Sequence, residues 1–270
     1  MLREPAVAGR FYPQSKSDLI KQITSFLPKK IQKKDVVGAI LPHAGYIYSG
    51  KVAVETACII EPKKIFIVIG PNHSGIGENF SIQTKGKWLT PLGEVAIEEY
   101  LASELLKNSL LLKEDSLAHK FEHSIEVELP ILQYFNTSFK FIPIAIMSSD
   151  TEKLKEFGNE LAINLEKSGR IKDIVIIASS DMTHYEKHEE ASKKDKVAID
   201  AILSLDADLL VKNLTKLNIT MCGWGPAIIL LSYAKKIKAN KTKLIKYQTS
   251  AAASGDYNSV VGYAGIIITR

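Results

Sequence analysis

The sequence is poor in cysteine and arginine and has no long apolar run. Two cysteines in 270 residues cannot build a disulfide framework, and no signal-like segment precedes Arg10, so we expect a reducing, cytoplasmic location. Only four of the 35 basic residues are arginines, which argues against nucleic acid as a partner because base and phosphate recognition favours guanidinium forks. No apolar stretch approaches the roughly 20 residues that cross a bilayer. We therefore expect no membrane span.

Several common cofactor and nucleophile motifs are also absent. No Gly-x-Gly-x-x-Gly follows a predicted strand, and no glycine-rich loop ends in Gly-Lys-Ser or Gly-Lys-Thr, so no nucleotide cofactor is predicted. The lack of Gly-x-Ser-x-Gly argues against a serine hydrolase. No linker or repeat divides the chain, and 46% hydrophobic residues suffice for a large core. We expect a single domain over residues 1–270.

Short apolar runs alternate with amphipathic segments along the chain. Runs rich in Val, Ile and Phe, apolar on both faces as in buried parallel strands, cover 36–41, 65–69, 139–146 and 173–178. Helical periodicity is found over 17–27, 50–60, 97–107, 125–135, 152–167, 191–203, 207–214 and 225–238. Antiparallel hairpin structure is predicted over 80–84 and 87–95, with Pro91 and Gly93 between, and a closing pair of strands is predicted over 244–250 and 259–269. These patterns predict a three-layer α/β/α sandwich around a mixed, mostly parallel sheet.

Histidines follow three of the predicted parallel strands within a few residues. They are His43, His73 and His184. The carboxyl ends of neighbouring parallel strands meet at one edge of a sheet, where ligands bind, and imidazole is the commonest metal ligand. One such histidine is more often structural, but three at equivalent positions favour a metal or acid–base site.

Two further residues extend this candidate site. Asp181 precedes His184 by three residues, and its carboxylate can orient the imidazole or cap a helix. Cys222 lies just before the predicted helix 225–238, where a thiol is biased toward the thiolate that binds metals. Cys58 lies on an apolar helix face and is predicted to be a core residue.

The remaining histidines have less informative surroundings. In Glu-His-Ser-Ile-Glu, Ser124 is predicted to cap the helix 125–135, which leaves His123 either structural or in support of the site. His119 and His188 lie among charged residues and are interpreted as solvated.

Short motifs spread over nearly the whole chain carry a family resemblance. They occupy 5–13 (PAVAGRFYP), 41–50 (LPHAGYIYSG), 70–73 (GPNH), 122–126 (EHSIE), 179–185 (SSDMTHY) and 222–223 (CG). Together, in this order, they resemble the Memo family, which occurs in animals, archaea and bacteria. The resemblance implies a fold like that of the class III extradiol dioxygenases of the LigB type.

The resemblance also implies a metal site. Its ligands would be His43, His73 and Cys222, with Asp181 and His184 beside them. A thiolate replaces the carboxylate of the dioxygenase triad, which makes the donor set softer and favours iron or copper, with zinc as the alternative. The family further implies a radical S-adenosylmethionine protein and an AMMECR1-like protein as partners.

Our first hypothesis is a metal-dependent redox or oxygenase-like enzyme that acts on a small-molecule or peptide ligand. His184 would serve as acid–base group and Asp181 would orient it, while Tyr46, His123 and Trp224 would contact the substrate. The alternative is a non-catalytic module that binds a peptide or protein in the same cleft. Metal-assisted hydrolysis at a zinc ion is a third, weaker hypothesis.

Overall fold

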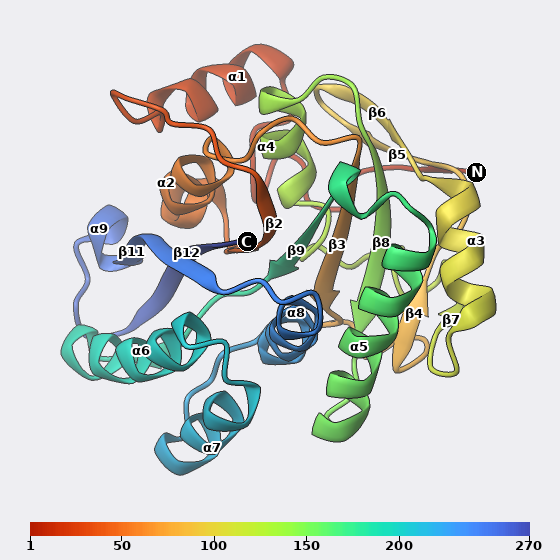
Figure 1. Cartoon of the computed structure of the whole chain (residues 1–270). Coiled ribbons are helices and arrows are strands. Elements are labelled where there is room, and N and C mark those ends of the chain that lie inside the picture. The colour runs from red at the N-terminus through yellow and green to blue at the C-terminus, as the bar shows by residue number, and fades with distance from the viewer.

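The computed structural model describes residues 1–270 and contains a nine-stranded sheet between two layers of helices (Figure 1). The strand order is β10-β12-β2-β9-β3-β8-β4-β7, and β11 pairs with β12 outside this path. The strands are β2 (Val36–Leu41), β3 (Ile65–Pro71), β4 (Phe80–Ile82), β7 (Lys113–Glu114), β8 (Lys140–Ile146), β9 (Ile174–Ser179), β10 (His184–Glu186), β11 (Lys241–Thr249) and β12 (Val260–Thr269).

The centre of this sheet is parallel and is bordered on each side by an antiparallel pair. Strands β2, β9, β3 and β8 run parallel to one another, whereas β12 pairs antiparallel with β2, and β4 pairs antiparallel with β8. Every residue of β2, β3 and β9 is buried, which explains why these strands are continuous apolar runs rather than alternating ones. The predicted mixed sheet is confirmed, as is the closing pair β11–β12.

Helices cover both faces of the sheet (Figure 1). Gly38 faces Leu230 of α8, while Gly265 on the opposite face contacts Thr56 of α2. The helices are α1 (Lys16–Ser25), α2 (Tyr46–Ala57), α3 (Glu99–Asn108), α4 (Glu128–Phe135), α5 (Thr151–Lys167), α6 (His188–Leu203), α7 (Ala207–Leu217), α8 (Trp224–Lys236) and α9 (Ala251–Ser254). None combines the length and apolar character needed to cross a membrane.

The predicted hairpin region is correct in part. The segment 80–84 was expected to belong to it, but β4 pairs with β8 of the main sheet. The hairpin forms instead within the second segment, between β5 (Lys87–Thr90) and β6 (Gly93–Ala96), and β1 (Leu2–Arg3) joins it as a third strand. All three residues of β4 are buried, so its apolar content reflects the main sheet rather than a surface hairpin.

Candidate metal centre

The candidate centre lies where three neighbouring parallel strands end. In the order β2, β9, β3, these strands end at Leu41, Ser179 and Pro71. Two residues beyond these ends lie His43, Asp181 and His73, one after each strand. The register pairs Leu41 with Ser179, which brings the loops after β2 and β9 to the same level. The topology therefore brings the three side chains to one edge of the sheet, as expected for an α/β fold.

His43, His73 and Cys222 form the first group of potential ligands. One ligand atom from each lies within 4.8 Å of the others. Cys222 comes from the loop before α8, and its sulfur lies 3.3 Å from His43 Nε2. The backbone N–H of Asp181 donates to the same sulfur at 3.3 Å, which ties this loop to the end of β9. Two imidazoles and one thiol at this spacing are a suitable donor set for zinc, iron or copper.

His43 is the buried member of this group. The residue is 2% exposed, and its Nδ1 lies 2.8 Å from Ser179 Oγ. Burial lowers the pKa of His43 well below its usual range, and His123 and His73 lower it further. The ring is therefore neutral, which is the form that binds metals.

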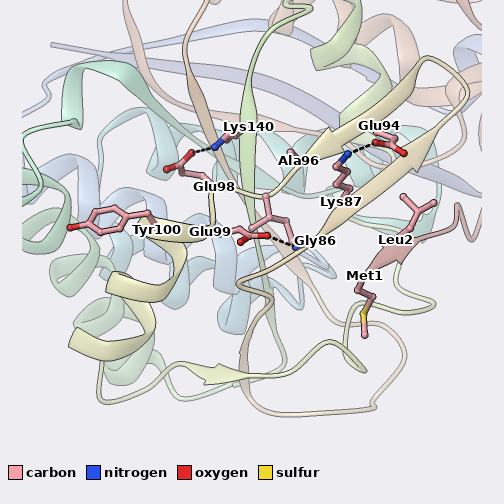
Figure 2. A pocket seen from close by; sticks show the side chains of 11 residues that line it. Met1, Leu2, Gly86, Lys87, Glu94, Ala96, Glu98, Glu99, Tyr100 and Lys140 are labelled. Carbon is pink, nitrogen blue, oxygen red and sulfur yellow. Dashed lines mark hydrogen bonds and ion pairs between the residues drawn. The ribbon is translucent and has the colours of Figure 1, made fainter.

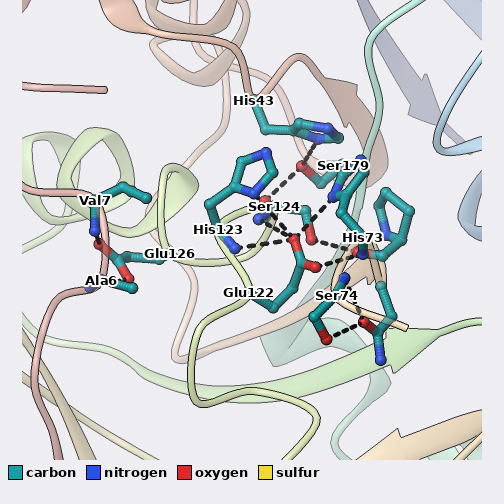
Figure 3. Close-up of polar contacts among 12 residues, drawn as sticks. Ala6, Val7, His43, His73, Ser74, Glu122, His123, Ser124, Glu126 and Ser179 are labelled. Atoms are coloured by element: carbon teal, nitrogen blue, oxygen red, sulfur yellow. Dashed lines mark hydrogen bonds and ion pairs between the residues drawn. The ribbon is translucent and has the colours of Figure 1, made fainter. Parts of the chain in front are cut away.

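His73 is the open member, and Glu122 orients it (Figure 3). His73 Nδ1 donates to Glu122 Oε1 at 2.9 Å, and its backbone N–H donates to the other carboxylate oxygen. Burial alone would raise the pKa of Glu122, but the hydrogen bond and charge of His73 hold it well below its usual range. With Nδ1 occupied, Nε2 is the nitrogen free to bind a metal. The His73 side chain is 35% exposed, so ligands can reach this side.

His123 and Phe11 complete the wall next to His73. The His123 ring stacks on His73 with centroids 4.6 Å apart, and the Phe11 ring lies 4.8 Å from His123. His73, Glu122 and His123 also form a second group with ligand atoms within 4.8 Å. Neither Glu122 nor Phe11 was predicted as a site residue, although both lie within the motifs quoted above. Both residues contact the histidines only because segments that are far apart in sequence come together in the fold.

Asp181, His184 and Cys222 form a third group within 4.8 Å. Burial raises the pKa of Asp181 to about 7, against the lowering effect of the backbone N–H groups of His43 and Ala44. This carboxyl group therefore exchanges a proton near neutral pH. His184 Nδ1 donates to the Thr220 carbonyl at 2.8 Å, which leaves Nε2 as the basic nitrogen.

The predicted thiolate bias of Cys222 is wrong for the metal-free protein. Burial raises the pKa of the Cys222 thiol well above its usual range, and the negative charge of Asp181 raises it further. The nearby start of α8 does not overcome these two effects. Only a bound cation would reverse them, because metal coordination deprotonates a thiol.

Two residues predicted to contact substrate make other contacts in the structure. Tyr46 is 1% exposed, and its hydroxyl donates to the Val127 carbonyl at 2.7 Å, so it packs in the core. Trp224 lines a different hollow, together with Val211 and Ile219. Both aromatic side chains therefore pack against the hydrophobic core, although they are close in sequence to the candidate ligands.

Two other expectations from the sequence are also wrong. His119 was interpreted as solvated but is completely buried, with its ring 5.7 Å from that of Trp88. Ser124 does not cap a helix, because its hydroxyl donates to the Pro71 carbonyl and α4 begins only at Glu128. Residues 124–127 form turns before α4, and Glu122 and His123 directly precede them in the site.

A surface hollow of about 620 Å³ lies at the small sheet and the start of α3 (Figure 2). Its charged side chains pair with one another, as in Lys87 with Glu94 at 2.7 Å and Lys140 with Glu98 at 3.0 Å. None of the metal-binding candidates lines it. We therefore place the candidate functional site at the histidine cluster rather than in this hollow.

Replacing Glu122 by alanine should weaken zinc binding about 10–100-fold, because the partner that orients His73 is lost. Glutamine keeps an acceptor for His73 Nδ1 but not the charge, so Glu122→Gln should lie between alanine and wild type. Calorimetric titration with Zn²⁺ measures both, with circular dichroism to verify folding. An alanine variant with wild-type affinity would contradict this role of Glu122.

Comparison with known proteins agrees with the resemblance seen in the sequence. The family model described as Memo-like protein matches residues 3–267. A MEMO1 family protein of Methanosarcina mazei is 42% identical over 269 residues, covering 99% of both chains. Another, from Sulfurisphaera tokodaii, is 43% identical over 282 residues and covers 98% of this chain and 99% of its own.

A solved structure confirms the fold class. An uncharacterized protein of Escherichia coli K12 superposes with a TM-score of 0.56 over 85% of this chain and 98% of its own, at 13% identity. At that identity the likeness concerns the fold alone. The family match, by contrast, extends over almost every residue and includes both histidines and the cysteine of the first ligand group. The chain belongs to the Memo family.

Proposed function

We propose that this protein is a metal-dependent redox or oxygenase-like enzyme. The observation that carries the proposal is the convergence of His43 Nε2, His73 and Cys222 Sγ, each supplied by a different loop at one sheet edge. Both histidines have Nδ1 next to an oxygen partner, which is the usual arrangement of metal-ligating imidazoles. His43, His73 and Cys222 would hold the metal, which would be iron or copper, and zinc is the alternative.

A bound redox metal would supply electron transfer or oxygen activation. The chain's own residues would bind the substrate and handle protons. His184 Nε2 is available to accept a proton, because Nδ1 is committed to Thr220. Asp181, whose pKa is raised by burial to about 7, would hold or release a second proton beside Cys222. His73 and His123, on the open side, would contact the incoming substrate.

The test begins with metal content after purification without chelators. Wild type should carry iron or copper near one ion per chain, and His43→Ala and Cys222→Ser should lose it. Their affinity should fall by more than the roughly 10–100-fold typical of losing a ligand's hydrogen-bond partner. Cys58→Ser is the matched control, because Cys58 is a buried residue of the core outside the ligand groups.

Oxygen consumption with added reductant then tests the redox part of the proposal. Wild type loaded with iron or copper should consume oxygen, and both ligand variants should not. If wild type binds no metal, or if the variants match it in metal content and oxygen consumption, the enzyme proposal is wrong.

A peptide- or protein-binding module is the second candidate, supported by exposed apolar side chains that are close in sequence to the candidate ligands. Ile47 and Tyr48 lie at the start of α2 and are 62% and 36% exposed. Tyr185, directly after His184, is 79% exposed and has a positive φ of 61°, which is unusual for a bulky residue. The radical S-adenosylmethionine and AMMECR1-like partners implied by the family fall under this candidate. Peptide binding that persists after metal removal would favour it.

A further inference from the structure

A buried polar chain lies behind His43, on the side away from Cys222. Ser179 Oγ is its centre, at 2.8 Å from His43 Nδ1, 2.7 Å from the Ser124 carbonyl oxygen and 2.8 Å from Glu128 Oε1. Figure 3 shows His43, Ser179 and Ser124 in this arrangement. All four residues are buried, so water does not compete for these contacts.

The hydrogen atoms around Ser179 can be assigned by counting. A serine hydroxyl has one proton to donate and two lone pairs that accept. The Ser124 carbonyl can only accept, so the single Ser179 proton points to it. Both remaining neighbours must then donate to Ser179: His43 through Nδ1–H, and Glu128 through a carboxylic O–H. Any other assignment leaves two acceptors facing each other at hydrogen-bond distance inside the protein, which is costly.

We propose that Glu128 is a buried, neutral carboxylic acid that acts through Ser179 to hold His43 in its Nδ1-protonated tautomer. His43 Nε2 then carries the lone pair and faces Cys222 Sγ at 3.3 Å. Glu128 is thus a positioning residue that is linked to His43 by two hydrogen bonds, one between Glu128 and Ser179 and one between Ser179 and His43. The tautomer of His43 and the protonated state of Glu128 do not depend on a bound metal. Only their effect on metal binding rests on the proposed function.

The surroundings of Glu128 support the neutral form. No lysine, arginine or histidine forms an ion pair with it, and its second oxygen, Oε2, has no hydrogen-bond partner. Burial raises the pKa of Glu128 well above its usual range, and Asp181 raises it further. A buried carboxylate without a cation is far less favourable than a buried neutral acid.

Glu126, two residues earlier, shows what an ionised carboxylate in this region requires. It is equally buried, but it accepts from the Arg3 guanidinium, the Tyr12 hydroxyl and two backbone N–H groups. Glu128 has one contact where Glu126 has four. Glu126, which is paired with Arg3, is therefore the matched comparison for Glu128, which has no cationic partner.

The metal-free protein provides the first test. Infrared difference spectra of wild type against Glu128→Gln at neutral pH should contain the carbonyl stretch of a protonated carboxyl group. The corresponding spectra for Glu126→Gln should contain the bands of a carboxylate. Nitrogen NMR of the imidazoles should show His43 protonated at Nδ1 in wild type and in Glu128→Gln, whose amide N–H replaces the acid O–H. In Ser179→Ala the Nε2–H form should become populated.

Titration with Zn²⁺ alone provides the second test. Glu128→Gln should bind zinc within about 3-fold of wild type, whereas Ser179→Ala should bind about 10–100-fold more weakly. The inference is overturned by a carboxylate signal from Glu128, by an Nε2-protonated His43 in wild type, or by a glutamine variant as weak as Ser179→Ala. If neither wild type nor any variant binds zinc while the infrared and NMR spectra are as expected, the proposed function is wrong and the assignment of Glu128 stands.

Discussion

Replacing Glu126 by alanine is expected to lower the free energy of unfolding by about 3–5 kcal/mol, the typical effect of removing one partner of a buried ion pair. Glu126 accepts hydrogen bonds from Arg3 Nη1 at 2.6 Å, from Tyr12 Oη at 2.6 Å and from the backbone N–H groups of Ala6 and Val7 at 2.8 and 3.0 Å. Alanine leaves a guanidinium and three other donors without this acceptor. Equilibrium unfolding in urea measures the loss.

The same substitution should loosen the N-terminal segment next to the candidate metal centre. This segment brings Phe11 against His123, and its Phe11 carbonyl accepts from the N–H of Tyr46 at 2.7 Å. Glu94→Ala is the matched control, because Glu94 pairs with Lys87 at the surface, where both side chains are about half exposed. That variant should change stability far less, because a solvent-exposed ion pair contributes little. An equal, small loss in both variants would show that Glu126 does not anchor the segment.

The importance of Glu126 illustrates what could not be predicted from the sequence. The spacing placed it in the first turn of a helix beginning near Ser124, since Ser followed by acidic residues is a typical helix start. In the structure Ser124 and Glu126 have tertiary partners, Pro71 and Arg3, more than 50 residues away in sequence. Local capping rules do not contain such partners, so the helix start was misplaced while its end at Phe135 was predicted correctly.

The layers of the fold were much easier to predict. The buried strands β2, β3, β8 and β9 were located to within two residues at each end, because strands covered by helices on both faces stand out as uninterrupted apolar runs. The strand order was not predicted, because the apolar pattern of a strand does not identify its neighbours. For the same reason β4 was assigned to a hairpin instead of the main sheet.

The site was predicted in outline and not in its supporting contacts. His43, His73 and Cys222 lie together as expected from strand ends and from the family resemblance, and Asp181 and His184 lie beside Cys222. Glu122, Ser179 and Glu128 were not recognised as groups that orient the histidines. Their function follows from distances across loops and strands, and a buried neutral acid has no distinct signal in the sequence.

Replacing Gly223 by alanine is expected to distort the candidate metal centre and to weaken zinc binding. Gly223 follows Cys222, and its N–H donates to Ser180 Oγ at 3.0 Å. A Cβ on Gly223 would collide with the backbone oxygen of Ser179 and with Ser180 Cβ. The end of a buried central strand cannot move aside, so the loop that carries Cys222 must shift. Overpacking of this kind costs about 1–3 kcal/mol of stability.

The displaced sulfur should reduce affinity for Zn²⁺ more than 10-fold, because ligand atoms must stay within about 0.5 Å of their working positions. Gly225→Ala is the control two residues further along α8. A Cβ there meets Ile146 and Leu154 at 3.4 Å, which is ordinary van der Waals contact, so both stability and zinc affinity should stay near wild type. Calorimetric titration and urea unfolding of the two variants separate the outcomes. If Gly223→Ala binds zinc as well as Gly225→Ala, the approach of this loop to β9 does not position Cys222.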